Sequence, residues 1–253
     1  MITTASDAGP SWPAPWPALA AIDALLRTPD RVLDRIDAGQ DLPGLARAYI
    51  ATMVLGTAVL GATLGSYRGG AQILFAAAKL PLVAVLTAVL VTPAFVAVRR
   101  AVHGAVDPRR DAVRVLACLA LAALLTSATA PLLLLLMSLG LDYHACTLSA
   151  VACCGLGGLG GGALAVRVVS RDPAPGRRWQ LAILVVVASL SGAQLAWTLR
   201  PYLVRPRAID VPFVRDLEGS FFEAVAQSLD SARGRFHRDA APLPEGTPPA
   251  WHR

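Results

Sequence analysis

Apolar residues in this chain gather into five long runs, and nearly all of the charged residues lie between the runs. A helix of about 20 residues crosses the hydrocarbon core of a bilayer, and each run is long enough to do so. The pattern therefore predicts an all-α, polytopic membrane protein built as a bundle of five transmembrane helices. The predicted spans cover residues 48–65, 74–98, 115–139, 145–166 and 179–199.

The segments that flank the bundle predict short amphipathic helices at both of its ends. Residues 17–38 hold two apolar stripes at helical spacing, separated by Thr28 and Pro29. Ser220 and Glu223 have capping-box spacing and predict a short helix in the second flanking segment. We divide the chain into a disordered cytoplasmic tail, a cytoplasmic amphipathic segment, the five-span domain, an external segment with a short helix, and a second disordered tail, at residues 1–16, 17–44, 45–200, 201–232 and 233–253.

Two placements of the segment 17–44 agree with its pattern. An amphipathic helix can lie on the cytoplasmic surface of the membrane with its apolar face in the interface. Two short helices can instead form a hairpin that packs on the loops of the bundle. The apolar stripes suit either placement, and the sequence leaves both open.

The arginines predict the orientation of the bundle. They cluster in residues 27–47, 99–114 and 167–178, whereas the other two short loops hold only Arg68. Five spans place all three arginine-rich segments on one side, which the positive-inside rule makes cytoplasmic. The amino terminus is then cytoplasmic and the carboxyl terminus external. In the fifth span, Trp179 and Trp197 lie about 27 Å apart along a helix, as anchors at the two interfaces would.

Composition narrows the class of protein further. Hydrophobic residues make up 55% of the chain and charged residues 16%, against about 25% charged residues in soluble domains. A net charge of +6 can indicate a nucleic-acid partner. Here membrane orientation accounts for the arginines, so we expect the lipid bilayer and no nucleic acid. The preference for arginine over lysine, with abundant alanine and glycine, suggests a bacterial genome of high GC content, and together with the five spans it leads us to expect the bacterial inner membrane.

Motifs of catalysis and metal binding are missing from the sequence. None of the five runs contains an aspartate or glutamate, although proton relays and ion-coupled pumps usually need one inside the membrane. We find no zinc-protease, serine-hydrolase or P-loop motif. His144, Cys146, Cys153 and Cys154 lack the paired spacing of a zinc site. We therefore expect no enzyme, no cofactor and no metal.

Lys79 is the only lysine in the chain and the only charged residue within a predicted span. Such a residue is a candidate functional site, here for an anion or another substrate. Its long side chain can also extend to the outer interface or make a structural hydrogen bond. We predict a polar cluster in the outer third of the bundle, made of Lys79, Gln194, Asp142, Arg68, Arg200 and His144.

The fourth run is rich in glycine. Small residues let helices approach each other closely within a bilayer. We therefore predict that Gly155, Gly158 and Gly162 pack against a neighbouring helix. The alternative is that this helix lines a path for a substrate.

Three stretches carry a resemblance to a known group of proteins. They are residues 65–70 (GSYRGG) continuing to 79–82 (KLPL), 192–201 (GAQLAWTLRP), and 218–225 (EGSFFEAV). Over residues 45–230 the chain resembles a family of uncharacterised bacterial multi-pass inner-membrane proteins, which brings no established activity. A weaker, architectural resemblance is to the Yip family of five-span membrane proteins, and it implies a partner-binding role without catalysis.

The sequence as a whole favours a non-enzymatic scaffold or accessory subunit of an inner-membrane complex. Its partner would be another membrane protein or a second copy of the chain. The alternative is a small transporter or channel for an anion or small solute, which would use Lys79 and the glycine-rich fourth span.

Overall fold

The computed structural model describes residues 17–104, 106–171, 176–199, 202 and 225, and every element in these parts is a helix. The two expected tails lie outside the described residues. So do Arg200 and all of the external segment 201–232 except residues 202 and 225, and with it all of its expected short helix except Val225.

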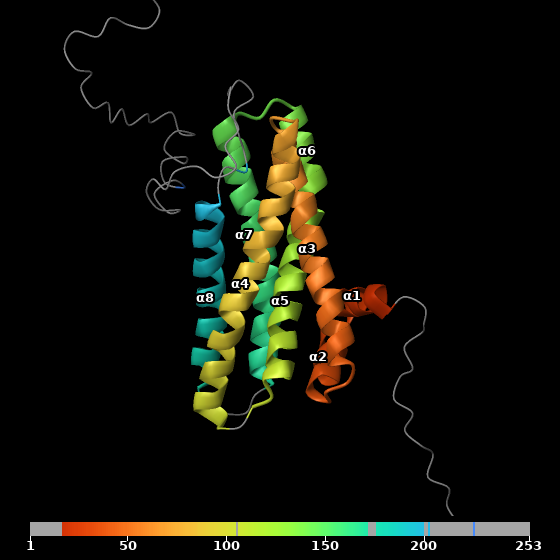
Figure 1. Cartoon of the computed structure of the whole chain (residues 1–253), viewed down its shortest axis with the longest axis vertical. Coiled ribbons are helices and arrows are strands. Elements are labelled where there is room, and N and C mark those ends of the chain that lie inside the picture. The colour runs from red at the N-terminus through yellow and green to blue at the C-terminus, as the bar shows by residue number, and fades with distance from the viewer. Residues whose placement is uncertain (1–16, 105, 172–175, 200–201, 203–224, 226–253) are drawn as a thin grey trace, which may run out of the picture.

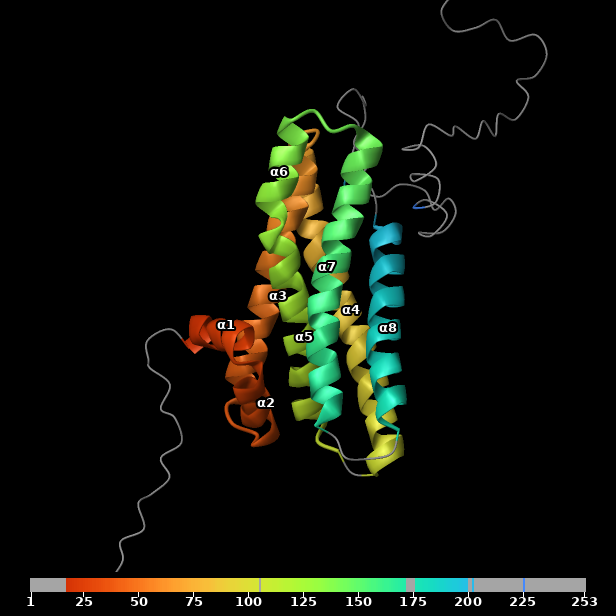
Figure 2. The same ribbon diagram turned by 180° about the vertical axis from the view of Figure 1, so that it is seen from behind.

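The five predicted spans are confirmed as helices that are long and apolar enough to cross a membrane. They stand side by side in one bundle, with α8 on its outside (Figure 1). Seen from behind, α7 lies between the α5–α6 span and α8 (Figure 2). The spans are α3 (Leu42–Ser66), α4 (Ala71–His103), α5 (Pro108–Ala128) continued by α6 (Ala130–Ser138), α7 (Tyr143–Ser170) and α8 (Arg177–Thr198).

The third span is interrupted between α5 and α6. Pro131 follows this point, and a proline has no N–H to donate to the carbonyl of the preceding turn. The backbone tightens there, since the N–H of Thr129 bonds to the carbonyl of Thr126 at 3.1 Å. In contrast, α4 continues as one helix past both Pro81 and Pro93.

Glycines set the distance between α3 and α4. A Cβ at Gly65 would lie 2.5 Å from the carbonyl oxygen of Gln72, and one at Gly61 would collide with the carbonyl of Ala76. No other residue type fits at these two positions without moving the backbone. The two helices are therefore as close as small residues allow in a bilayer.

Two glycines on α7 make a similar contact with α5. A Cβ at Gly157 would lie 2.6 Å from the carbonyl oxygen of Ala122, and one at Gly161 would lie 2.7 Å from that of Cys118. Gly157 and Gly161 are four residues apart and therefore share a helix face. The fourth span thus packs through glycine, as the sequence predicts.

The particular glycines predicted for this packing do not meet another helix in the described part of this chain, and their packing against a helix of another subunit stays a prediction. A Cβ at Gly155, Gly158 or Gly162 would have no atom within 4 Å outside its own stretch of helix. Each residue turns a helix by about 100°, which places these three on a different face from Gly157 and Gly161. The sequence contains glycine on both faces, and only packing shows which face meets α5.

The amino-terminal helices form a hairpin on the bundle. In α2 (Pro29–Asp37), the stripe of Val32, Leu33 and Ile36 is buried to 2% exposure or less. These residues join the same apolar core as α5 and α7. The packed hairpin is therefore the correct placement for α2, although it rests on the helices and not on the loops.

The first helix of the hairpin has a mixed environment. α1 (Pro17–Arg27) lies across the direction of the spans and beside α3 (Figure 1). Its Leu25 is buried, whereas Leu19 and Leu26 are 59% and 50% exposed. An orientation across the spans with exposed leucines is the geometry of an interfacial helix.

Candidate functional site

The arginine-rich segments meet at one end of the bundle, where helix α2 also lies. Arg171 after α7 pairs with Asp34 at 2.5 Å, and Arg167 pairs with Asp30 at 3.0 Å. From α5, Arg114 pairs with Asp37 at 2.5 Å. We call this part of the molecule the arginine-rich end. Its ion pairs connect α2 to two spans that lie far from it in the sequence.

The sequence contains a signal for these ion pairs, which are not among the predicted features. Asp30, Asp34 and Asp37 are spaced so that they share one face of α2. Two pairs of arginines on the spans are each separated by four residues, which also places them on common faces. They are Arg110 with Arg114 and Arg167 with Arg171.

Apolar burial contributes more to docking of the hairpin than the ion pairs do. Full burial of a valine, leucine or isoleucine side chain is worth roughly 1.5–3 kcal/mol, and three such side chains of α2 are buried. Exposed ion pairs contribute about 0–1 kcal/mol each, and Asp30 and Asp34 are more than half exposed. The ion pairs therefore chiefly fix the register of α2 on the bundle.

Arg171 is held strongly in its charged form. Partial burial by itself would lower the pKa of Arg171. Hydrogen bonds and attraction from Asp34 and Asp30 outweigh that effect and raise the pKa of Arg171 above its ordinary value. Arg171 therefore keeps its positive charge near neutral pH.

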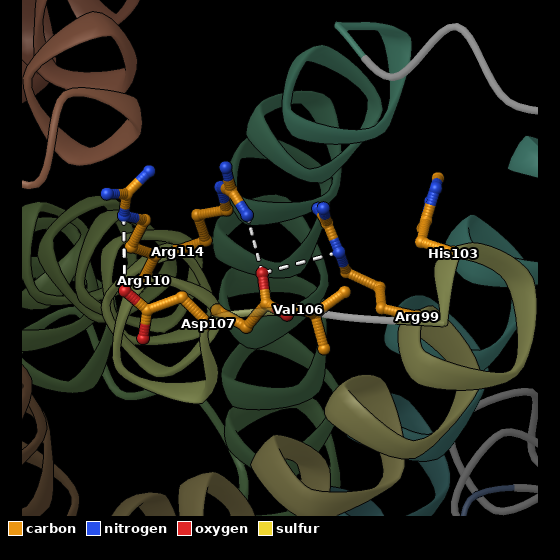
Figure 3. Close-up of a pocket in the computed structure, with 7 residues that line it drawn as sticks. Arg99, His103, Val106, Asp107, Arg110 and Arg114 are labelled. Carbon is orange, nitrogen blue, oxygen red and sulfur yellow. Dashed lines mark hydrogen bonds and ion pairs between the residues drawn. The ribbon is translucent and has the colours of Figure 1, made fainter.

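A polar pocket of about 250 Å³ opens at the same end, between the end of α4 and the start of α5. We call it the arginine pocket. Figure 3 shows that its guanidinium groups and its imidazole extend in the same direction from the two helices. The lining residues are Arg99, His103, Val106, Asp107, Arg110, Asp111 and Arg114.

Asp111 organises the centre of the arginine pocket. It is 1% exposed and pairs with Arg114 at 2.5 Å and with Arg99 at 3.3 Å. A buried carboxylate is tolerated only when opposite charges and hydrogen bonds compensate its lost hydration. Asp111 thereby holds one guanidinium from α4 and one from α5 at the floor of the pocket.

Asp111 is not among the residues predicted from the sequence. It lies just before the apolar run 115–139, so the run itself contains no acid. The helix α5 begins earlier, at Pro108, and brings Asp111 into the packed end of the span. The signal was an aspartate one turn before a span and three residues from Arg114.

The rim of the pocket is fixed by the start of α5. Asp107 caps the helix, accepting a hydrogen bond from the backbone N–H of Arg109 at 2.9 Å. Its second oxygen pairs with Arg110 at 3.2 Å. Arg110 also donates to the backbone carbonyl of Asp37 at 2.7 Å. The rim thus connects the pocket to the hairpin.

The arginine pocket lies at the level of an aromatic anchor. The side-chain nitrogen of Gln180 is 3.1 Å from the Nε2 of His103 on the pocket wall. The neighbouring Trp179 is 72% exposed at the start of α8, and Trp197 lies at the other end of this helix. Tryptophans at helix ends mark the membrane–water interfaces. The pocket therefore lies at the same level along the bundle as the tryptophan-bearing start of α8.

Lys79 lies in the interior of the bundle. It is 0% exposed and points away from the lipid-facing surface of α4. About two helical turns toward the start of α4, Gln72 is also 0% exposed and donates to the carbonyl of Tyr202 at 2.9 Å. The outer half of α4 thus carries buried polar side chains on its inner face.

The other members of the predicted polar cluster occupy different environments. Gln194 is exposed on α8. Asp142 is exposed and caps α7, accepting from the N–H of Ala145 at 2.9 Å. His144 is partly buried and makes an edge-on ring contact with Tyr143. Arg68 is partly buried near the end of α3. Lys79 does not share the exposed surroundings of Gln194 and Asp142, and the cluster as a whole stays a prediction.

Cysteine and histidine show no metal-binding arrangement in the part of the chain that the structure describes. No group of three or more His, Cys, Asp or Glu residues there is placed to hold an ion. The four thiols are free of disulfides, and Cys118, Cys146 and Cys153 are buried among apolar side chains.

Comparisons with protein-family models, with curated proteins and with solved structures found no match for this chain. The resemblances stated from the sequence, to uncharacterised bacterial multi-pass proteins and to the Yip family, therefore stay predictions.

Proposed function

We propose that this integral membrane protein is a non-enzymatic scaffold or accessory subunit of a complex in the bacterial inner membrane. Its arginine-rich end faces the cytoplasm. The proposal starts from the five spans and from the gathering of three arginine-rich segments at one end.

The observation that carries the scaffold proposal is the second glycine face of α7. One face, with Gly157 and Gly161, is occupied by α5. The other, with Gly155, Gly158 and Gly162, has open space where side chains would lie. A helix of another subunit can approach such a face as closely as α5 approaches the first.

The close packing of the interior also supports a scaffold over a conduit. Gly61 and Gly65 bring α3 against α4, and a Cβ at Gly56 would lie 3.1 Å from the carbonyl oxygen of Ala123 on α5. Helices in such contact leave little room for a solute between them. A rigid bundle of this kind suits a protein that holds other subunits in place.

The second candidate function is a small transporter or channel, and the burial of Lys79 favours it. A buried cation within a span is costly and is usually kept for a role in binding or transport. In this case Lys79→Met abolishes uptake of an anion into vesicles, and Arg68→Ala reduces it much less. Equal effects of the two substitutions would remove Lys79 from consideration as a transport site.

The test of the scaffold proposal is affinity purification of the tagged chain from native membranes, followed by native mass determination. We expect a stoichiometric second membrane protein or a second copy of the chain. Gly158→Leu fills the open face of α7 and should remove that partner. Leu156→Phe, at an exposed position of the same helix, is the matched control and should keep it.

The outcomes separate the two functions. Loss of the partner with Gly158→Leu alone supports the scaffold proposal. A monomer without any partner overturns the scaffold proposal and makes the transporter the favoured function.

A further inference from the structure

We propose that the arginine pocket binds a phosphate group at the membrane surface. This inference goes beyond the scaffold proposal, because it assigns a ligand to a site that a partner protein does not require. It rests on the geometry of Arg99, Arg110 and Arg114 and on the level of the pocket along the spans.

The geometry provides several donors around one space. Arg99 reaches the pocket from the end of α4, and Arg110 and Arg114 reach it from the start of α5 (Figure 3). A guanidinium carries five N–H donors in a planar fork that matches the oxygens of a phosphate. Arginines from two helices can therefore contact one polyatomic anion from two sides.

The buried Asp111 holds two guanidinium groups of the pocket in fixed positions. Asp111 pairs with Arg99 and Arg114 and fixes both guanidinium groups before a ligand arrives. Asp107 is engaged by the cap of α5 and by Arg110. The lining holds three arginines and two aspartates, and Asp37 of α2 pairs with Arg114 from outside the lining, so these charges are balanced before a ligand arrives. The pocket thus holds its guanidinium donors in place.

The depth of the pocket points to a phosphate that the membrane itself supplies. Gln180 joins the pocket wall at His103, and the adjacent Trp179 marks the interface. Basic pockets between spans on the cytoplasmic side bind lipid headgroups in this region. The same donors fit a free phosphate or a phosphorylated solute, so the experiment has to separate these sources.

The experiment uses the full-length chain, purified in detergent and examined by native mass spectrometry. The probes are phosphatidic acid, phosphatidylcholine and inorganic phosphate. Arg110→Gln removes one pocket guanidinium, and Arg109→Gln removes the same charge from an exposed neighbour outside the lining. Because Arg110 also contacts the hairpin, Arg99→Gln serves as a second pocket variant on a different helix.

We expect saturable binding of phosphatidic acid in preference to phosphatidylcholine. Arg110→Gln and Arg99→Gln should each weaken it about tenfold or more, as loss of a charge-assisted hydrogen bond does. Arg109→Gln should change it less than about twofold.

The arms then identify the source of the phosphate. If millimolar inorganic phosphate displaces phosphatidic acid, and phosphate also binds the protein when no lipid is present, the ligand is a soluble phosphate. Retention of phosphatidic acid under the same conditions assigns a lipid headgroup. Equal loss in all three arginine variants, or no preference for phosphatidic acid and no binding of phosphate, overturns the proposal. Neither result depends on whether a partner protein co-purifies.

Discussion

Arg114 on α5 forms an ion pair with Asp37 on α2 at 2.5 Å, across 77 residues of sequence, while it also pairs with the buried Asp111. One guanidinium therefore connects the amino-terminal hairpin to the interior of the third span. The two partners differ in burial, because Asp37 is 38% exposed and Asp111 is 1% exposed. Loss of Arg114 should therefore cost more stability through the buried Asp111 than through the partly exposed Asp37.

Substitutions at the two ends of this pair should have different effects on stability. Arg114→Met leaves Asp111 buried with one partner fewer, and we expect a cost of about 3 kcal/mol in the free energy of unfolding. Asp37→Asn affects a partly exposed pair and should cost about 0–1 kcal/mol. Unfolding in mixed micelles measures both. Equal costs would show that Asp111 does not depend on Arg114.

The hairpin should detach more readily when its apolar contact is reduced than when its charges are removed. Ile36→Ala leaves a cavity at a fully buried position, and we expect the docked state to lose about 2–5 kcal/mol. Asp34→Asn removes an exposed ion pair and should cost about 0–1 kcal/mol. Trypsin cleavage after Arg31, which is exposed, reports local opening of α2. Faster cleavage in the Asp34 variant than in the Ile36 variant would contradict this order.

A larger side chain should destabilise the protein on one glycine face of α7 and not on the other. Gly157→Leu places atoms where the α5 backbone lies, and overpacking of this kind costs about 1–3 kcal/mol or more. Gly158→Leu enters open space and should leave the stability of the purified monomer unchanged. Thermal unfolding in detergent compares the two variants. A similar loss in both would mean that α7 is rotated relative to the packing described above.

Accessibility of introduced cysteines tests the proposed orientation. Arg109→Cys lies at the arginine-rich end, and Ser138→Cys lies at the opposite end of the same span; both positions are exposed. In a background without the native cysteines, a membrane-impermeant thiol reagent added to intact spheroplasts should label only Ser138→Cys. Arg109→Cys should react after the membrane is permeabilised. The reverse pattern would invert the topology.

The number and order of the spans follow from the sequence alone. A bilayer requires about 20 apolar residues for each crossing helix, and every backbone polar group must be satisfied within the helix. Both conditions act along the chain, so the runs that end near Gly65 and Leu199 mark spans without knowledge of their neighbours. The gathering of Arg114 and Arg171 at one end follows from the same count of crossings.

The tertiary structure decided everything that depends on the rotation of a helix about its own axis. Each span carries apolar residues on all of its faces, because its lipid neighbours and its protein neighbours are equally apolar. The periodicity of the sequence therefore does not distinguish the inner face of a span from the outer one. Contact between helices therefore determined that Gly157 packs while Gly158 stays open, and that Lys79 is enclosed. It also determined that Asp111, which precedes the apolar run in sequence, is buried between two arginines.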